Sequence, residues 1–187
     1  MLPLGTKAPN FELPDTAGKT KSLADFADSQ LLVVAFICNH CPFVVHIKPE
    51  LANFAAKYQA QGVGFVAINS NDAEAYPDDS PEAMKAEQEK FAYPFPYLFD
   101  ESQETAKAYQ AACTPDFFLF NQARELIYRG RFDASSPGNE IPVTGEELGK
   151  AIEHALNGSE LSESDQSPSI GCNIKWKPGA APAYFPG

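Results

Sequence analysis

Residues 31–42 of the chain read LLVVAFICNHCP, and this stretch decides the fold class. Its first part, residues 31–37, is a continuous apolar run rich in branched side chains, which is typical of a strand buried on both faces of a parallel sheet. Pro42 suits the first position of a helix, because its missing N–H would have had no partner within the helix. The stretch therefore predicts a strand followed directly by a helix, with Cys38 and Cys41 at their junction.

The rest of the chain repeats this alternation of helices and strands. Apolar spacing predicts a helix over residues 42–61 that Pro49 kinks. A cap at Ser80 followed by Pro81 predicts a helix over residues 80–91. The D-x-x-Q pattern of Asp100 and Gln103 predicts a helix over residues 100–111, and the T-x-x-E capping box of Thr144 and Glu147 predicts a helix over residues 144–156. Strands are predicted at residues 11–13, 63–68, 93–99 (short or irregular), 117–120 and 126–128. Together these elements predict an α/β layered domain over residues 1–157. Residues 158–187 form a C-terminal tail, which we expect to pack on the domain.

The composition excludes several classes of protein. At 187 residues and 44% hydrophobic content the chain is of the ordinary globular type. A formal net charge of −11 argues against binding to nucleic acid or to an anionic membrane. The apolar runs are too short to span a bilayer, and the N-terminus lacks the pattern of a secretory signal, so we expect a cytoplasmic protein. Nothing in the sequence indicates its oligomeric state.

The Cys38-Asn39-His40-Cys41 pattern places two thiols at the start of a helix. The thiolate is the nucleophilic form of cysteine, and the partial positive charge and free N–H groups of a helix N-terminus lower the thiol pKa. His40, when protonated, would stabilise a neighbouring thiolate further. Two intervening residues also let the sulfurs reach disulfide distance within one turn. We therefore interpret Cys38 and Cys41 as a redox-active pair.

Two other interpretations of the pair stay open. Free cysteines are often inert residues of a hydrophobic core. Alternatively, Cys38 and Cys41 are half of a zinc site that Cys113, Cys172 or a histidine completes. The sequence contains no second closely spaced pair of ligands, so we expect no metal and no other cofactor.

Four segments spread over nearly the whole chain carry a resemblance to known proteins. They are GTKAPNFELPD at residues 5–15, FICNHCPFV at residues 36–44, CTPDFFLF at residues 113–120 and GCNIKWKPG at residues 171–179. They resemble the thioredoxin superfamily, and specifically its peroxiredoxin-like branch. The resemblance implies a thioredoxin-like (glutaredoxin-type) mixed central sheet flanked by helices, with an N-terminal extension and a wrapping C-terminal tail.

The resemblance also implies roles for individual residues. Pro115 would be a cis proline packed beside the active cysteines, with Thr114 presenting its backbone to a substrate; a trans proline that begins an edge strand is the alternative. A gap-free match to a thioredoxin places Cys41 at the attacking position and Pro49 at that family's helix-kinking proline. Interpreting C-N-H-C as a disulfide-isomerase motif would instead make Cys38 the nucleophile.

The activity that the resemblance implies is thiol–disulfide exchange, in which Cys41 attacks and Cys38 resolves. The partners would be a thiol or disulfide of a protein or small molecule and a cellular reductant. The alternatives are an antioxidant thiol peroxidase with Cys41 as the peroxidatic cysteine, and a non-enzymatic zinc- or partner-binding module. Peroxiredoxins carry Thr or Ser where this chain has Cys38, and an activating Arg where it has Thr114. Fast peroxidase activity is therefore not expected unless a later arginine, Arg129 or Arg131, replaces that donor.

The other two cysteines are less well defined by the sequence. Cys113 lies two residues before Pro115, so we interpret it either as an alternative resolving cysteine or as a small buried residue. No local physical argument assigns a role to Cys172. Its segment is expected to fold back over the domain with Trp176 as a packing anchor.

Overall fold

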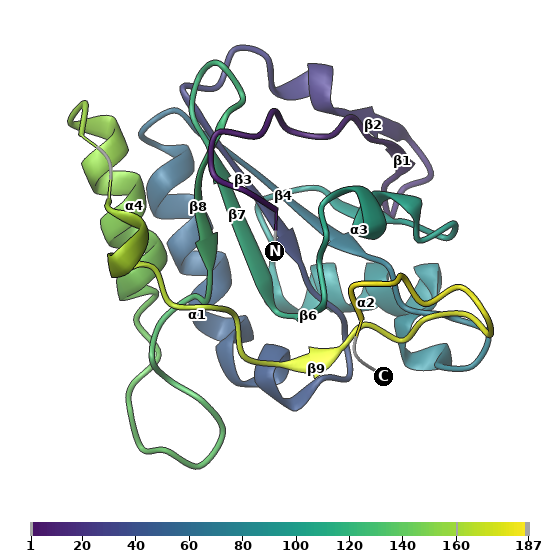
Figure 1. The fold of residues 1–187 in the computed structure, drawn as a ribbon. Coiled ribbons are helices and arrows are strands. Elements are labelled where there is room, and N and C mark those ends of the chain that lie inside the picture. The colour runs from purple at the N-terminus through teal and green to yellow at the C-terminus, as the bar shows by residue number, and fades with distance from the viewer. Residues whose placement is uncertain (1, 160, 186–187) are drawn as a thin grey trace.

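A five-stranded sheet with the order β5-β4-β3-β7-β8 forms the centre of the computed structural model, which describes residues 2–159 and 161–185 (Figure 1). Its strands are β3 (Leu31–Phe36), β4 (Val63–Asn69), β5 (Tyr97–Phe99), β7 (Asp116–Phe120) and β8 (Leu126–Gly130). Strands β3, β4 and β5 run parallel, whereas β7 is antiparallel to β3 and β8 is antiparallel to β7. The mixed central sheet of a thioredoxin-like fold is therefore confirmed.

Helices and short strands surround this sheet. The helices are α1 (Pro42–Gln59), α2 (Pro81–Phe91), α3 (Glu104–Ala108) and α4 (Glu146–Leu156), with single 3-10 turns η1 (Leu23–Phe26), η2 (Pro77–Asp79) and η3 (Glu163–Asp165). Two small antiparallel pairs lie outside the sheet: β1 (Glu12–Pro14) with β2 (Thr20–Ser22), and β6 (Cys113–Thr114) with β9 (Cys172–Asn173). None of the helices among the described residues is both long enough and apolar enough to cross a membrane.

Strand β3 shows why the apolar run must be continuous. Successive side chains of a strand point to opposite faces of the sheet. Alternate residues starting at Leu31 enter a core built with α1, α2 and α4, and those starting at Leu32 enter a second core that includes residues of the N-terminal segment and of α3. All six residues of β3 are buried, because both faces of the sheet are covered. This confirms the buried strand that residues 31–37 predicted.

Helix α1 directly follows this strand and begins at Pro42, as predicted. Its apolar side faces the first core, with Val44, Ile47, Leu51, Phe54, Ala55 and Tyr58 buried. The helix ends at Gln59, close to the predicted end, and Gly62 follows with a positive φ of 85°. The first core therefore holds both elements that flank the short loop between β3 and α1.

Helix α3 is shorter than the helix predicted over residues 100–111. The buried Asp100 carboxylate accepts hydrogen bonds from Ser70 Oγ (2.8 Å) and from the backbone N–H of Ala106 (3.0 Å). Gln103 adopts a left-handed φ of 65° and donates from its side chain to the backbone oxygens of Ser70 and Lys175. The D-x-x-Q pattern therefore serves mainly contacts between distant segments.

Helix α4 is capped differently from the prediction. The expected capping box of Thr144 and Glu147 is absent: the N-cap residue is Gly145, and Glu147 forms an ion pair with Arg131 (2.6 Å). Asp133, from the loop after β8, accepts hydrogen bonds from the backbone N–H groups of Thr144 (2.7 Å) and Gly145 (2.6 Å). A residue distant in sequence thus satisfies backbone donors at the start of this helix.

Replacing this cap should destabilise the protein measurably. We expect Asp133→Ala to lower the free energy of unfolding by about 1–3 kcal/mol in urea titrations, because buried N–H groups lose their acceptor. Although burial opposes it, hydrogen bonds from Ser135, Gly145 and Thr144 lower the pKa of Asp133 below its ordinary value of 3.8. The stabilisation is therefore present above that value and is lost as the pH falls through the lower, folded-state pKa, where wild type and variant should converge.

Thr144→Ala is the matched control, because its side chain makes only a 3.3 Å contact with the N–H of Glu146. An equal loss of stability in both variants would contradict the assignment of the cap to Asp133.

The C-terminal segment lies along the domain at the end of the sheet where β3 meets α1 (yellow in Figure 1). We define residues 166–176 as the C-terminal strap. The backbone N–H of Arg131 donates to Ser167 O (3.2 Å), and the N–H of Ile174 donates to Ala112 O (3.1 Å). Ile174 is buried, and Trp176 packs against the second core. The strap therefore joins β8, β6 and the second core.

Candidate active site

Cys38 and Cys41 lie in the loop between β3 and α1, and Cys41 is the N-cap residue of α1. Their positions follow from the sequence, since the buried strand ends at Phe36 and Pro42 starts the helix. Cys38 is 1% exposed and Cys41 is 0% exposed. The two thiols that the sequence singled out are thus brought together, but both are covered.

Buried polar groups hold this loop in place. Asn39 donates its backbone N–H to the Asp79 carboxylate (2.7 Å), and its carbonyl accepts from the buried ammonium of Lys48 (2.7 Å). Its side-chain oxygen accepts from the hydroxyl of Tyr97 (3.0 Å). Asp79 is itself fully buried and also accepts from the side-chain amide of Asn71 (2.8 Å). A buried carboxylate and a buried ammonium therefore bind neighbouring backbone groups beside the cysteines.

The pKa of the Cys41 thiol lies well below its ordinary value of 9.0, despite its burial. The largest cause is a hydrogen bond from the Cys38 side chain to the Cys41 sulfur. The Cys172 side chain and the backbone N–H groups of Val44 and Cys172 also donate to it. The first turn of α1 supplies the donor of Val44, as expected for a thiolate at a helix N-terminus. In its protonated form, Cys41 can instead donate to Thr114 O, 3.1 Å away.

The pKa of the Cys38 thiol is shifted in the opposite direction to that of Cys41. Its pKa is raised well above 9.0, first because its proton is shared with Cys41, then because it is buried, and then because of the nearby charge of Asp79. Cys38 Sγ also lies 3.2 Å from Thr114 Oγ1. These opposite pKa shifts favour the thiolate at Cys41 and the protonated thiol at Cys38.

Thr114 contacts both sulfurs, and the Thr114–Pro115 bond is cis, as the resemblance implied. The backbone of Thr114 is paired with β9, opposite Cys172. The neighbouring Cys113 is opposite Asn173, and its sulfur lies 3.8 Å from Pro115 O. The edge to which the resemblance assigned a substrate is thus occupied by the chain's own strap.

The contact between the strap and β6 is very close at Gly171. A Cβ atom at this position would lie 2.1 Å from Thr114 O, which no side chain can tolerate without displacement. On the N-terminal side, Ser169 Oγ donates to the carboxylate of Asp116 (2.6 Å). The strap therefore covers Thr114, and Cys41 beneath it, with backbone in direct contact.

His40 lies between Asp79 and Tyr76. Its Nδ1 atom is 2.7 Å from Asp79 Oδ2, and its ring stacks on Tyr76 with centroids 5.4 Å apart. The proposed tuning of the thiolate by His40 stays a prediction. Ligand atoms of Cys38, His40 and Asp79 lie within 4.8 Å of one another, so these three could hold a metal ion. This set differs from the one expected, which combined Cys38 and Cys41 with Cys113, Cys172 or a histidine.

Arg129 and Arg131 each form an ion pair with a glutamate, and Arg131 also lines a pocket with Phe43 and Pro115. Arg129 contacts Glu163 (2.7 Å) and Arg131 contacts Glu147 (2.6 Å). Both guanidinium groups are therefore already paired with a carboxylate.

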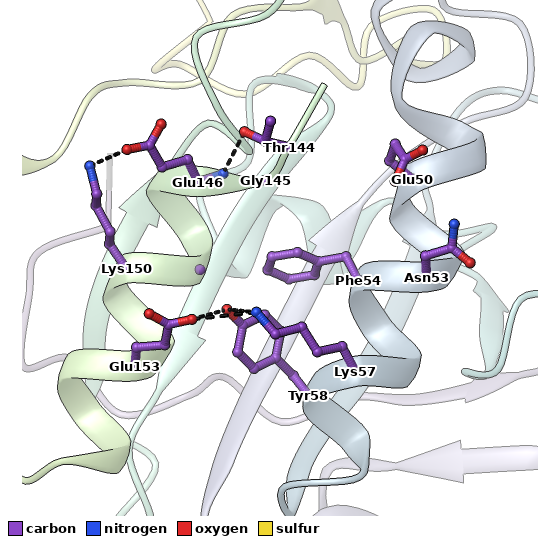
Figure 2. A pocket seen from close by; sticks show the side chains of 11 residues that line it. Glu50, Asn53, Phe54, Lys57, Tyr58, Thr144, Gly145, Glu146, Lys150 and Glu153 are labelled. Atoms are coloured by element: carbon purple, nitrogen blue, oxygen red, sulfur yellow. Dashed lines mark hydrogen bonds and ion pairs between the residues drawn. The ribbon is translucent and has the colours of Figure 1, made fainter. Parts of the chain in front are cut away.

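A large pocket lies elsewhere, between α1 and α4 (Figure 2). Phe54 and Tyr58 line it together with charged residues, among them Lys57 and Glu153. The hydroxyl of Tyr58 donates to Glu153 (2.8 Å), and Lys57 lies 3.4 Å from the same carboxylate. No cysteine lines this pocket, so it takes no part in the thiol site.

A family comparison adds to this geometry, since the model of the Redoxin family matches residues 3–148. The chain belongs to the Redoxin family. Among curated proteins, it is 27% identical over 123 residues to the thiol-disulfide oxidoreductase ResA of Bacillus subtilis, covering 66% of this chain and 64% of ResA. The match thus spans less than two thirds of that relative.

Two solved structures are more similar to this redoxin. A hypothetical protein from Sinorhizobium meliloti is 52% identical with a TM-score of 0.93, covering 96% of this chain and 97% of that chain. An uncharacterized conserved protein from Geobacillus kaustophilus is 54% identical with a TM-score of 0.93, covering 96% and 95%. Both support the fold over nearly its whole length, and neither description assigns a function.

Several site residues of this redoxin were missed in the sequence. Asn69 and Asn71 come at and just after the end of β4, and carboxyl ends of parallel strands meet at one edge of a sheet. That pattern could have indicated polar groups near the end of β3. Asp79 and Lys48 carry no comparable signal, because their roles depend on folding of the chain between them.

The difference between the two thiols predicts a titration result. We expect the thiolate absorbance of the reduced redoxin to show one group whose pKa lies well below the ordinary thiol value of 9.0, and Cys41→Ala to lack it. Cys38→Ala should shift this ionisation upward, because the strongest donor to the thiolate is lost. Cys172→Ala should shift it upward by less, since its contribution is smaller. An unchanged profile in Cys38→Ala would contradict the assigned cause.

The strap predicts how accessible Cys41 is. We expect Gly171→Ala to increase alkylation of Cys41 by iodoacetamide about tenfold, since a methyl group in close contact costs about 1–3 kcal/mol and displaces the strap from Thr114. Gly18→Ala is the control, because a Cβ there has no neighbour within 4 Å and any strain from its positive φ of 75° falls in the turn between β1 and β2, outside the strap. Equal alkylation rates in both variants would show that the strap does not limit access.

Proposed function

We propose that this redoxin is a thiol–disulfide oxidoreductase in which Cys41 is the nucleophile and Cys38 the resolving cysteine. The observation that carries the proposal is the surroundings of Cys41. Its sulfur sits at the N-terminus of α1, receives hydrogen bonds that favour the thiolate, and has a second thiol in contact. Disulfide exchange requires a thiol of low pKa and a second thiol next to it.

The first step converts the Cys41 thiolate into a mixed disulfide. The thiolate attacks one sulfur of a substrate disulfide, a bond to Cys41 forms, and the substrate S–S bond breaks. The other substrate sulfur leaves with the electron pair and takes a proton from water. The substrate belongs to the class of protein or small-molecule disulfides, and the strap must move aside for it to reach Cys41, which is fully covered.

The second step needs Cys38 to lose its proton. Its pKa is high chiefly because its proton is shared with the Cys41 thiolate. Once Cys41 is part of a disulfide its charge is gone, so this cause disappears and Cys38 ionises more easily. Cys38 then attacks Cys41, forming the Cys38–Cys41 bond and releasing the remaining substrate thiol. The substrate gains two electrons, and a cellular thiol reductant restores the dithiol.

The curated relatives support this class of reaction. ResA is named a thiol-disulfide oxidoreductase, and the match to it includes about two thirds of this chain. A peroxidase is the weaker alternative, because Arg129 and Arg131 are paired with glutamates and Cys38 replaces the Thr or Ser of peroxiredoxins. Activation of a peroxide therefore lacks the expected donors.

Kinetics with oxidised glutathione test the proposal. We expect Cys41→Ala to reduce disulfide consumption to the uncatalysed rate, because the ionised nucleophile is removed. Cys38→Ala should still release one equivalent of thiol in the first step, but it cannot form the Cys38–Cys41 bond. Mass spectrometry of unreduced peptides from oxidised wild type should show that bond.

Val45→Ala is the control, since Val45 is an exposed residue of α1. Full activity in Cys41→Ala with loss in Cys38→Ala would reverse the two roles and overturn the proposal. Consumption of hydrogen peroxide by the wild type well above the rate of a free thiol would favour the peroxidase instead.

A further inference from the structure

Cys172 lies on the same face of the β6–β9 pair as the reactive thiols. Residues directly opposite in an antiparallel pair project to the same side, and Cys172 is opposite Thr114. The side chain of Thr114 reaches Cys38 Sγ at 3.2 Å, which identifies this side as that of the active site. Cys113 precedes Thr114 in the strand and therefore projects to the other side. The register thus brings a third sulfur toward Cys41 and turns the fourth away.

The strap holds Cys172 in this place from both directions. Gly171 lies so close to Thr114 O that there is no room for a side chain. On the other side, the N–H of Ile174 donates to Ala112 O (3.1 Å), and the N–H of Lys175 donates to Asn71 Oδ1 (2.8 Å). Cys172 is therefore part of a fixed structure opposite Thr114, whose backbone oxygen lies 3.1 Å from the Cys41 sulfur.

Exposure distinguishes Cys172 from the other two sulfurs of this cluster. Cys38 and Cys41 are buried, whereas Cys172 is only partly buried. A disulfide between Cys38 and Cys41 would accordingly be shielded from an external reductant. A disulfide that includes Cys172 would present one sulfur at the surface.

We propose that Cys172 is a third redox cysteine, which transfers the disulfide from the buried pair to the surface by forming a bond with Cys41. This inference rests on the proposed function of Cys41. Cys172 loses its proton and attacks Cys41 in the Cys38–Cys41 disulfide. The Cys41–Cys172 bond forms as the Cys38–Cys41 bond breaks, and Cys38 takes the electron pair and a proton. The step is an internal exchange, so it consumes neither an oxidant nor a reductant.

The next step regenerates the site with a thiol from solution. A small thiol or a protein dithiol attacks the partly exposed sulfur of Cys172 and expels Cys41 as the leaving thiolate. A thiol of low pKa leaves faster, and the surroundings of Cys41 stabilise its anion. A second equivalent of reductant then releases Cys172 from its mixed disulfide. The reductant therefore attacks Cys172, because this attack expels Cys41, which is the better leaving group.

Oxidation of Cys38→Ala with oxidised glutathione tests this inference, with unreduced peptides mapped by mass spectrometry. Without Cys38, Cys41 first forms a mixed disulfide with glutathione. We expect Cys172 to resolve it, so that the Cys41–Cys172 peptide pair becomes the main product and free glutathione is released. The double variant Cys38→Ala/Cys172→Ala should lose this pair completely and keep glutathione on Cys41.

Cys38→Ala/Cys113→Ala is the matched control and should form the same Cys41–Cys172 pair, because Cys113 faces the other side of β6. A stable glutathione adduct on Cys41 beside a free Cys172 in Cys38→Ala would overturn the inference and leave the proposed function intact. A Cys41–Cys113 pair would overturn it likewise. No adduct or disulfide at Cys41 in any of these proteins would instead remove the proposed function, and the inference with it.

Discussion

The proposed chemistry of this redoxin depends on the interaction between the Cys38 thiol and the Cys41 sulfur. Burial alone would raise the pKa of both thiols, because a charge is costly away from water. Hydrogen bonds from Cys38, from the strap and from the first turn of α1 reverse that effect for one sulfur. The pKa values of the two thiols are therefore shifted in opposite directions, downward for Cys41 and upward for Cys38.

This arrangement is possible because the site is closed by the chain's own tail. A substrate at the Thr114 backbone and the strap at the same backbone exclude each other, since an edge strand offers its hydrogen-bonding groups to one partner at a time. Closure supplies two of the donors to Cys41, so opening of the strap weakens support for the thiolate while it gives access to the sulfur. The pairing of β6 with β9 therefore controls both the stability of the Cys41 thiolate and the access of a substrate to its sulfur.

The sequence predicted the local features of this site well, and missed those built from distant segments. The apolar run of β3, the helix starting at Pro42 and the cysteine pair between them are readable because each depends on neighbouring residues. The cis bond at Pro115 came from family resemblance. Asp133 as the cap of α4 and Asp79 beside the loop were not foreseen, because a carboxylate binds whichever backbone donors the fold brings to it.

The position of Asp79 gives an independent reason for choosing between the two nucleophiles. It contacts the N–H of Asn39 and lies close to the Cys38 ligand atom, so its charge acts more strongly on Cys38 than on Cys41. A thiolate on Cys38 would face a buried carboxylate of the same sign, whereas a thiolate on Cys41 faces the positive end of α1. The disulfide-isomerase reading of C-N-H-C would thus place the charge at the less favourable sulfur. The position of Cys41 at the N-terminus of α1 and the charge of Asp79 beside Cys38 both favour the Cys41 sulfur as the nucleophile.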